Sequence, residues 1–245
     1  MTLITHILNV GKNPIVHRVT RGRLWRHAVR INRAVASPLV TTIDGFQIIT
    51  DDLDSLSLCV YHEYEPLVRE KMRSIIRPGD VVVDVGANIG YHTVLMASLG
   101  AEVIALEPHP GNFALLGKNL FMNDMPAYVY RVAASDEAGE VDLRISDTND
   151  GGHSIECSPV GSSGRTVCIT AIRLDQILPP GPIRLIKMDI EGHEAAAIRG
   201  LGDRLEDVEY IIYEHWHDRP SPDPSLYLDG WNIEIIAGDN YLARR

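Results

Sequence analysis

The feature that most constrains this chain is an apolar strand that runs into a glycine-spaced turn and then a helix. The run Val81–Val85 is β-branched apart from Asp84, and the turn Gly86–Gly90 follows it directly. The next segment, Tyr91–Leu99, has the pattern of a helix that Gly100 ends. Such a strand–turn–helix unit presents backbone N–H groups at a helix N-terminus, so we expect a nucleoside-containing cofactor to bind here.

A second acid fits the same expectation. Glu107 follows the apolar run Val103–Leu106, seventeen residues after Gly90, and is placed to bind a ribose diol. Strands alternate with helices along most of the chain, which predicts an α/β fold with a doubly wound, mostly parallel sheet. Ligands of such sheets bind beyond the carboxyl ends of the strands. Four acids end predicted strands and should meet there: Asp84, Glu107, Asp189 and Glu214.

Charge divides the chain into two parts. The 245 residues carry a net charge of −10, yet residues 1–43 contain no Asp or Glu and several Arg and Lys. We predict that residues 1–52 form an extension, with a helix over Arg21–Ala36 and a hairpin over Val40–Ile49, that serves as a lid or a dimer surface. Residues 53–245 then form the cofactor-binding domain, which is one domain by its length.

Composition excludes several partners. The strongly acidic body argues against nucleic acid as a partner, and no apolar run approaches the length of a membrane span. The three cysteines are widely spaced and suggest neither a disulfide framework nor a zinc site, which points to the cytoplasm. We therefore expect a small-molecule substrate and a homodimer that forms through the extension.

Further elements follow from the pattern of apolar and turn residues. Helices are expected to begin at Pro66, at Pro110 (ending near Met122) and near His193 (ending near Gly200). Strands are expected at Tyr128–Ala134, Gly139–Ile145, Thr166–Ile172, Ile183–Gly192, Tyr210–His215, Trp231–Ile236 and Tyr241–Ala243. The segment Asp147–Gly164 is rich in Gly, Ser, Asn and Asp and should be a long loop, which in a compact enzyme is often functional.

The turn favours one cofactor over another. Dinucleotide enzymes use G-x-G-x-x-G, whose middle glycine lets the backbone approach a pyrophosphate, and Gly86–Gly90 has no such glycine. Asp84 would also repel a pyrophosphate. S-adenosylmethionine carries an ammonium group and no phosphate, so Asp84 and the turn would hold its methionine end and Glu107 its ribose hydroxyls.

Four motifs in this order resemble the FkbM-type family of S-adenosylmethionine-dependent methyltransferases. They are D-V-G-A-N-I-G from Asp84, A-L-E-P ending at Pro108, G-G-H-S around His153, and I-K-M-D-I-E-G-H-E ending at Glu194. The resemblance runs from about Tyr64 to His215. It implies a seven-stranded Rossmann-like sheet and transfer of a methyl group, most often to a hydroxyl of a sugar or natural product, with some relatives acting on nitrogen.

The site residues follow from the motifs. We expect the cofactor to be bound by Glu65, Asp84, Gly86, Ala87, Asn88, Gly90, Glu107, Pro108, Ala134 and Asp189. Glu65 is equally explained as a favourable charge near a helix start, and so is Glu194.

Methyl transfer to an alcohol needs a group that removes the hydroxyl proton. His153, in a glycine-rich loop, is the leading candidate because imidazole titrates near neutrality. Asp189, Glu191 and Glu214 complete the catalytic set. A weaker alternative is a divalent metal held by the acids and histidines of Glu214–Asp218 together with Asp189, Glu191 and His193. The spacing matches no ligand motif, and we predict no metal.

The sequence thus predicts a methyltransferase that uses S-adenosylmethionine and methylates a hydroxyl of a sugar-containing or other small natural product. The alternatives left open are an N-methyltransferase acting on a peptide or small molecule, a metal-dependent hydrolase built on the acid–histidine cluster, and a binding module that keeps the fold.

Overall fold

A computed structural model describes residues 39–52, 54–146, 153–155, 162–217 and 221–245. The chain divides into two compact units, Met1–Tyr64 and Glu65–Arg245. The second unit thus begins later than the boundary after residue 52 that the sequence suggested. The helix expected over Arg21–Ala36 and most of the loop Asp147–Gly164 lie outside the described residues.

The described part of the first unit contains the predicted hairpin. Strand β1 (Leu39–Thr41) pairs antiparallel with β2 (Gln47–Ile49), and Val40 opposite Ile48 supplies its buried face. Gly45 has a φ of 86°, which suits the turn between the strands. A short helix, α4 (Leu58–Tyr61), follows.

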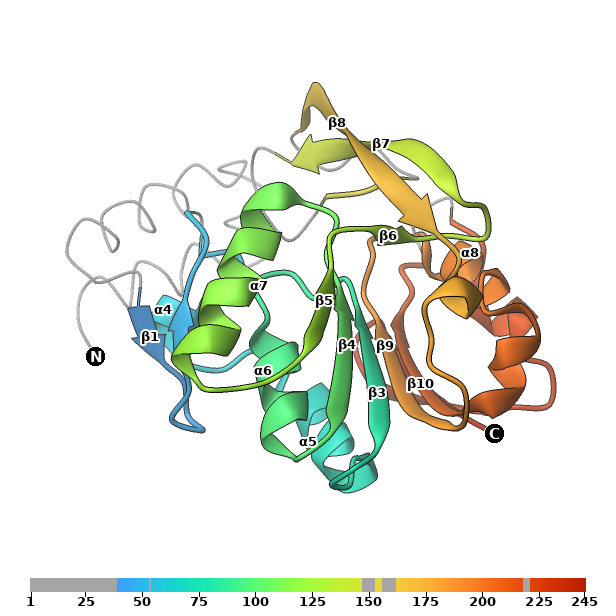
Figure 1. The fold of residues 1–245 in the computed structure, drawn as a ribbon, viewed down its shortest axis with the longest axis horizontal. Helices are drawn as coiled ribbons and strands as arrows, with labels where there is room; N and C mark the ends of the chain where they lie inside the picture. The colour runs from blue at the N-terminus through green and yellow to red at the C-terminus, as the bar shows by residue number, and fades with distance from the viewer. Residues whose placement is uncertain (1–38, 53, 147–152, 156–161, 218–220) are drawn as a thin grey trace. The chain divides into compact units, whose positions relative to one another are not determined.

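The second unit is built on a seven-stranded sheet in the order β11-β12-β10-β9-β3-β4-β5. Its strands are β3 (Val81–Val85), β4 (Glu102–Leu106), β5 (Tyr128–Tyr130), β9 (Ile183–Met188), β10 (Val208–Glu214), β11 (Asn232–Ala237) and β12 (Asn240–Arg244). β3 pairs parallel with both β4 and β9, whereas β12 runs antiparallel to β10 and β11. The strand order reverses at β3, where the doubly wound sheet places its ligand site (Figure 1).

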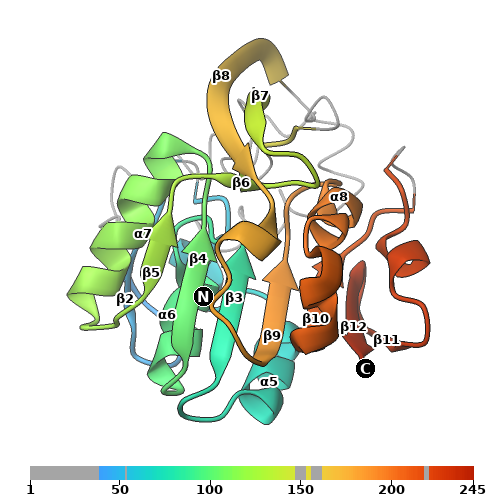
Figure 2. The same ribbon diagram turned by 45° about the vertical axis from the view of Figure 1, so that its right-hand side comes forward.

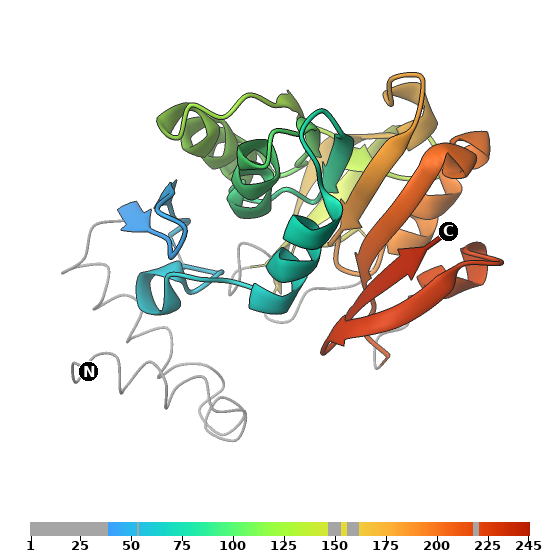
Figure 3. The ribbon, with the colours of Figure 1, turned by 90° about the horizontal axis from the view of Figure 1, so that it is seen from below.

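Helices cover both faces of this sheet, as predicted. α5 (Pro66–Ile75), α6 (Tyr91–Ser98) and α7 (Pro110–Met122) lie on one face, and α8 (Glu194–Arg199) lies on the other with the short 3₁₀ helices η1 (Leu174–Gln176), η2 (Gly202–Asp207) and η3 (Pro224–Tyr227) (Figure 3). The change of face follows from right-handed crossovers that leave β3 in opposite directions.

One departure from the sequence prediction concerns the third strand. The run Tyr128–Ala134 splits into β5 and a separate β6 (Ala133–Ala134), which joins β7 (Gly139–Ser146) and β8 (Ser162–Ile172) in a second sheet of order β6-β8-β7. β8 also begins before Thr166. This small sheet lies beyond the ends of β3, β4 and β9 toward which their arrowheads point (Figure 2).

The core explains why the sequence of α6 shows no separate apolar and polar faces. Residues Tyr91–Ala97 of this helix are all buried, because it packs against the sheet and between α5 and α7. A helix buried on every side has no polar face to show in its sequence. On the opposite face of the sheet, residues of β9 and β10 pack with α8 and Leu174.

Candidate functional site

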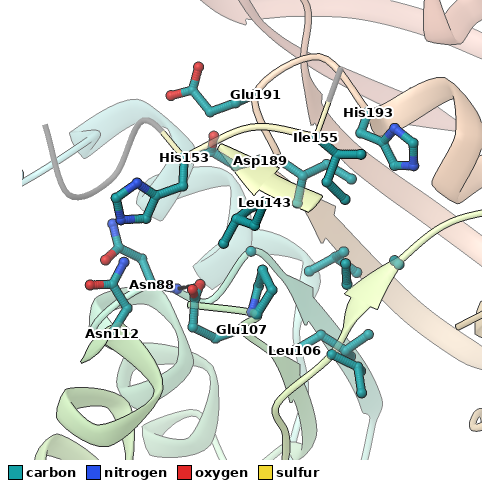
Figure 4. Close-up of a pocket in the computed structure, with 17 residues that line it drawn as sticks. Asn88, Leu106, Glu107, Asn112, Leu143, His153, Ile155, Asp189, Glu191 and His193 are labelled. Atoms are coloured by element: carbon teal, nitrogen blue, oxygen red, sulfur yellow. Dashed lines mark hydrogen bonds between the residues drawn. The ribbon is translucent and has the colours of Figure 1, made fainter. Parts of the chain in front are cut away.

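A pocket opens at the carboxyl ends of β3, β4 and β9, where a doubly wound sheet binds its ligand. Its lining residues come from the glycine turn, the ends of the strands, α7 and the small sheet (Figure 4). They are Val85, Gly86, Asn88, Leu106, Glu107, Pro108, Asn112, Val132, Ala133, Ala134, Leu143, His153, Ile155, Asp189, Ile190, Glu191 and His193.

The structure brings most predicted site residues together here. Of the ten residues expected to bind the cofactor, six line the pocket: Gly86, Asn88, Glu107, Pro108, Ala134 and Asp189. The other four, Glu65, Asp84, Ala87 and Gly90, are not in the lining. Of the catalytic set, His153, Asp189 and Glu191 line the pocket and Glu214 does not.

The two glycines of the turn are required by close contacts. A Cβ on Gly86 would stand 2.1 Å from the carbonyl oxygen of Asp189, and one on Gly90 would stand 2.6 Å from a methyl carbon of Leu116. Both residues also have positive φ values, of 82° and 88°. The turn can therefore lie against β9 and α7 only because these positions have no side chain.

Glu107 is joined to this turn by hydrogen bonds. One carboxylate oxygen accepts the N–H of Asn88 at 2.8 Å, and the other accepts the N–H of His109 at 2.8 Å. Burial raises the pKa of Glu107 to about 7, and the negative charges of Asp84 and Asp189 raise it further. The two N–H hydrogen bonds lower this pKa but do not outweigh the burial. Each carboxylate oxygen keeps a further lone pair for a ligand in the pocket.

Asp84 lies beneath the turn. Its side chain is fully buried, and Oδ2 accepts a 2.6 Å hydrogen bond from the hydroxyl of Thr93 on α6. Among the described residues Oδ1 has no hydrogen-bond partner. Asp84 stands opposite Lys187 of β9 in the sheet register, so their side chains share a face.

Lys187 connects Asp84 to the pocket. Its ammonium lies 3.3 Å from Oδ2 of Asp189, and its side chain is buried. Burial lowers the pKa of Lys187, but the carboxylates of Asp189, Asp84 and Glu65 outweigh this and raise it above its ordinary value. The lysine therefore stays charged and compensates the acids around it.

Glu65 belongs to the same buried network. Its carboxylate lies 2.9 Å from Nε2 of His92 and accepts a 3.0 Å hydrogen bond from the amide of Asn240. Burial raises its pKa, but the hydrogen bond from His92 and the Lys187 ammonium prevail and lower it to about 2. Glu65 precedes α5 at a φ of 46° and does not cap that helix with its side chain.

The turn after β9 carries Asp189 and Glu191 into the pocket. Glu194 holds this turn, because its carboxylate accepts the N–H groups of Ile190 at 2.8 Å and Gly192 at 3.0 Å. Burial raises the pKa of Glu194 to about 8. Its contacts are thus structural, in line with the helix-start role weighed for it from sequence. Glu191 has a φ of 57°, so the turn is tightly constrained.

Glu214 ends β10 outside the pocket lining. Burial raises its pKa to about 9, and the charges of Asp189 and Glu191 push in the same direction. At neutral pH its carboxyl group keeps a proton and is a hydrogen-bond donor. Of the residues the structure describes, no group of three or more His, Cys, Asp and Glu side chains could hold a metal ion.

His153 lies in the pocket near Glu107, the residue that follows β4. Its Nδ1 accepts the N–H of Ser146 at 3.1 Å, and its ring packs on that of His109 with centroids 4.2 Å apart. Burial lowers the pKa of His153 to about 4, and the nearby His109 adds to this. These features favour a neutral ring that donates a hydrogen bond over one that removes a proton.

Sequence reasoning missed part of the lining. Asn112 comes from the first turn of α7, Leu143 from β7, and Ile155 from the segment between β7 and β8. The sequence suggested His193 only as a metal ligand. In the structure its Nε2 lies 3.0 Å from the hydroxyl oxygen of Ser135. The sequence around these residues contains no motif that marks them as pocket residues, so the pattern alone could not identify them.

The chemistry of the lining selects the kind of ligand. Its charged residues are the acids Glu107, Asp189 and Glu191, and the lining contains no Lys or Arg. The N–H of Asn88, which a phosphate-binding turn would offer to its ligand, is used by Glu107. The pocket therefore suits a ligand that is neutral or positively charged, with hydroxyl groups, and disfavours a pyrophosphate.

Comparison with known families decides the relationship. The family described as the methyltransferase FkbM domain matches residues 84–229 of this chain, which is more than half of it. The chain belongs to the FkbM methyltransferase family. The predicted family and the methyltransferase class are thereby confirmed, and the seven-stranded order confirms the predicted fold.

Two named relatives share the family. The chain is 26% identical over 212 residues to the hexuronic acid methyltransferase AglP of Haloferax volcanii, covering 82% of each protein. It is 31% identical over 162 residues to the 31-O-demethyl-FK506 methyltransferase FkbM of Streptomyces tacrolimicus, covering 52% of this chain and 62% of that one.

Solved structures are more distant. An rRNA methylase from Streptococcus thermophilus has a TM-score of 0.45 and 13% identity, covering 72% of this chain and 92% of that one. This likeness is too low to bear on function. Within the described residues, the helices are too short or too polar to cross a membrane.

Proposed function

We propose that this FkbM-family member uses S-adenosylmethionine and methylates a hydroxyl group of a sugar-containing or other small natural-product acceptor. The observation that carries the proposal is the pairing of Glu107 with the Asn88 N–H at the switch point of the sheet. This leaves an acid, and no phosphate-binding turn, facing a pocket whose lining contains no Lys or Arg. S-adenosylmethionine has a ribose diol, two positive centres and no phosphate.

The residues present fit this cofactor. Glu107 would accept hydrogen bonds from the ribose hydroxyls, and the apolar end of the pocket, with Leu106, Pro108 and Ala134, would take the adenine. The methionine end would lie near Asp84 and Glu65. The buried, unpartnered Oδ1 of Asp84 is the kind of acceptor that the methionine ammonium requires, directly or through water.

S-adenosylmethionine supplies a methyl group already activated on a sulfonium sulfur. The protein then has to hold the acceptor oxygen in line and remove its proton. Asp189 and Glu191 line the pocket, and we propose them as the groups nearest the reacting oxygen. Glu214, which keeps its proton at neutral pH, would donate a hydrogen bond to the acceptor from just outside the lining.

The acceptor class follows from charge and from the relatives. An acceptor carboxylate would be repelled by Asp189 and Glu191, whereas a hydroxyl would not. One relative is named for a hexuronic acid, and the other for an O-demethyl natural product. The first name supports a sugar as the acceptor, and the second name and the acidic pocket support methylation of a hydroxyl.

Titration calorimetry with S-adenosylhomocysteine tests the cofactor, using Glu107→Gln against Glu102→Gln. Glu102 lies on the same strand, β4, and is exposed. We expect the wild type and Glu102→Gln to bind alike, and Glu107→Gln to bind at least about tenfold more weakly, since it loses charged hydrogen bonds to the ribose. If the folded wild type gives no heat with S-adenosylhomocysteine, the proposal fails.

The acceptor is tested separately. Labelled S-adenosylmethionine is offered with a panel of glycosides, their uronic acids and matched amines, and products are read by mass spectrometry. Label on a glycoside hydroxyl supports the proposal. Label confined to amines would replace it with the N-methyltransferase alternative, and label on uronic acid carboxylates would overturn the argument from pocket charge.

A further inference from the structure

The side chain of His153 is fixed by three elements. Its Nδ1 accepts the N–H of Ser146 at the end of β7, 3.1 Å away. Its ring packs against His109, which precedes α7. The next residue, Ser154, bridges Arg144 of β7 and donates its hydroxyl to the carbonyl of Glu191 at 2.9 Å. Only 9% of His153 is exposed, so the ring has one defined position.

This arrangement fixes the tautomer. A backbone N–H can only donate, so Nδ1 must be the unprotonated nitrogen of the ring. The neutral imidazole then carries its proton on Nε2. The lowered pKa of His153 agrees with a ring that is neutral at physiological pH. A ring in this state offers an N–H donor at Nε2 and has no free lone pair with which to remove a proton.

The donor at Nε2 has no partner among the residues that the structure describes. The same is true of the Oδ1 atom of Asn88, an acceptor on the same pocket wall. Figure 4 shows His153, Asn88 and Asn112 gathered at one end of the pocket, with Glu107 next to them and His193 at the other end. Buried polar atoms left unpaired in a pocket mark the positions that a ligand satisfies.

A hydroxyl group is the ligand that matches this set. Each hydroxyl donates one hydrogen bond and accepts others, so it needs both an acceptor and a donor nearby. The ionised carboxylate of Glu107 supplies only acceptors, and its two oxygens already receive N–H groups from Asn88 and His109. A vicinal diol bound to Glu107 would therefore still need a donor for its oxygen lone pairs.

We propose that His153 is a cofactor-binding residue whose Nε2–H donates to a ribose hydroxyl oxygen of S-adenosylmethionine, opposite Glu107. The inference rests on the proposed function. It moves His153 from the acceptor's reaction to the cofactor's recognition, and it leaves proton removal to the carboxylates of Asp189 and Glu191. His153 and Glu107 would then hold the ribose between them.

Two variants separate this role from that of a base. His153→Phe keeps a ring against His109 and removes the donor, whereas His153→Gln restores an N–H donor and is a poorer proton acceptor. We expect the dissociation constant of S-adenosylhomocysteine to rise about five- to tenfold in the phenylalanine variant and less than about threefold in the glutamine variant. At saturating S-adenosylmethionine, kcat should fall less than about threefold in both.

A deoxygenated ligand locates the contact. Removing the ribose hydroxyls from S-adenosylhomocysteine should weaken binding to the wild type more than to His153→Phe, because the variant has already lost part of that interaction. Circular dichroism and thermal melting check that both variants fold. If the phenylalanine variant fails to fold, the glutamine variant and the deoxygenated ligand still give the result.

Contrary outcomes are distinct. Unchanged affinity with kcat reduced about 100-fold or more in both variants would show that His153 is the base and overturn the proposal. Equal losses from ligand deoxygenation in wild type and variant would also overturn it. Failure of the wild type to bind S-adenosylhomocysteine would instead refute the proposed function.

Discussion

At the scale of single residues, the same carboxyl group serves different ends because its surroundings differ. The Glu65 carboxylate is hydrogen-bonded to His92 and lies near the charge of Lys187, so its pKa falls to about 2. Glu194 is buried against backbone N–H groups, and its pKa rises to about 8. Both were visible in the sequence as acids near helix starts. The sequence does not show which of the two lies near a positive charge, because Lys187 and His92 are far from Glu65 along the chain.

The first glycine of the turn offers a sharp test. In Gly86→Ala the new Cβ would collide with the Asp189 carbonyl oxygen, 2.1 Å away, at a φ of 82°. We expect a loss of roughly 2–4 kcal/mol in the free energy of unfolding, from steric overlap and backbone strain together. Urea denaturation followed by circular dichroism measures it.

Gly117→Ala is the matched control. Gly117 lies inside α7, and nothing stands within 4 Å of the position its Cβ would take. Alanine there should be neutral or stabilise by up to about 1 kcal/mol through helix propensity. Similar losses in the two variants would show that the contact with Asp189 does not constrain the turn.

At the scale of elements, the small sheet completes the pocket. β7 and the segment 153–155 form one wall of the pocket through Leu143, His153 and Ile155. The bond from Ser154 to the Glu191 carbonyl joins this wall to the turn after β9. The sequence pattern predicted two antiparallel strands, but period-two alternation does not say which sheet a strand joins.

Ser154→Ala tests this link. The substitution leaves the half-buried Glu191 carbonyl without that donor, so we expect a loss of about 1 kcal/mol in the free energy of unfolding. Hydrogen exchange should also quicken at the amides of Arg144 and Ser154, which bond to each other's carbonyls. Ser74→Ala is the comparison, because its hydroxyl bonds a carbonyl on the exposed surface of α5 and should change stability by less than about 0.5 kcal/mol. An equal, small effect in both would show that Ser154 does not hold the wall.

At the scale of the whole molecule, buried acids set the response to pH. The pKa is raised to about 7 in Glu107, about 8 in Glu194 and about 9 in Glu214, whereas each carboxyl of the unfolded chain titrates near 4.5. Above that value the unfolded state has released protons that the folded state keeps. Stability therefore falls as pH rises, until each group ionises in the folded state.

Two other groups act in the opposite direction at lower pH. His153, with a pKa lowered to about 4, costs stability as pH falls below 6.5, and Glu65 loses its contribution as pH falls from 4.5 toward 2. The decline caused by the buried acids should thus be clearest between pH 6.5 and 9.

Urea denaturation at pH 6.5, 7.5 and 8.5 measures the decline. We expect the free energy of unfolding to fall by on the order of 1 kcal/mol per pH unit. Glu194→Gln should give a shallower slope, and Glu102→Gln, at an exposed position, should keep that of the wild type. A free energy of unfolding that rises across this range would contradict the assignment.

The sequence by itself determined the local framework. The glycine turn, the helix Pro110–Met122 and the hairpin near Asp44 follow from φ preferences, proline positions and apolar periodicity, which act over a few residues. Strand-end acids were enough to place Glu107 and Asp189 at one edge, because parallel strands bring their carboxyl ends together.

Only the tertiary structure decided how the polar atoms are paired. Asp84 could be seen as an acid at a strand end, but its bond to Thr93 and its place beside Lys187 depend on helix packing and strand register. His153 could be seen as a loop histidine, but the Ser146 N–H that sets its proton comes from the end of β7. Hydrogen bonds need atoms within about 3 Å and in the right direction, and that geometry exists only after the chain has folded.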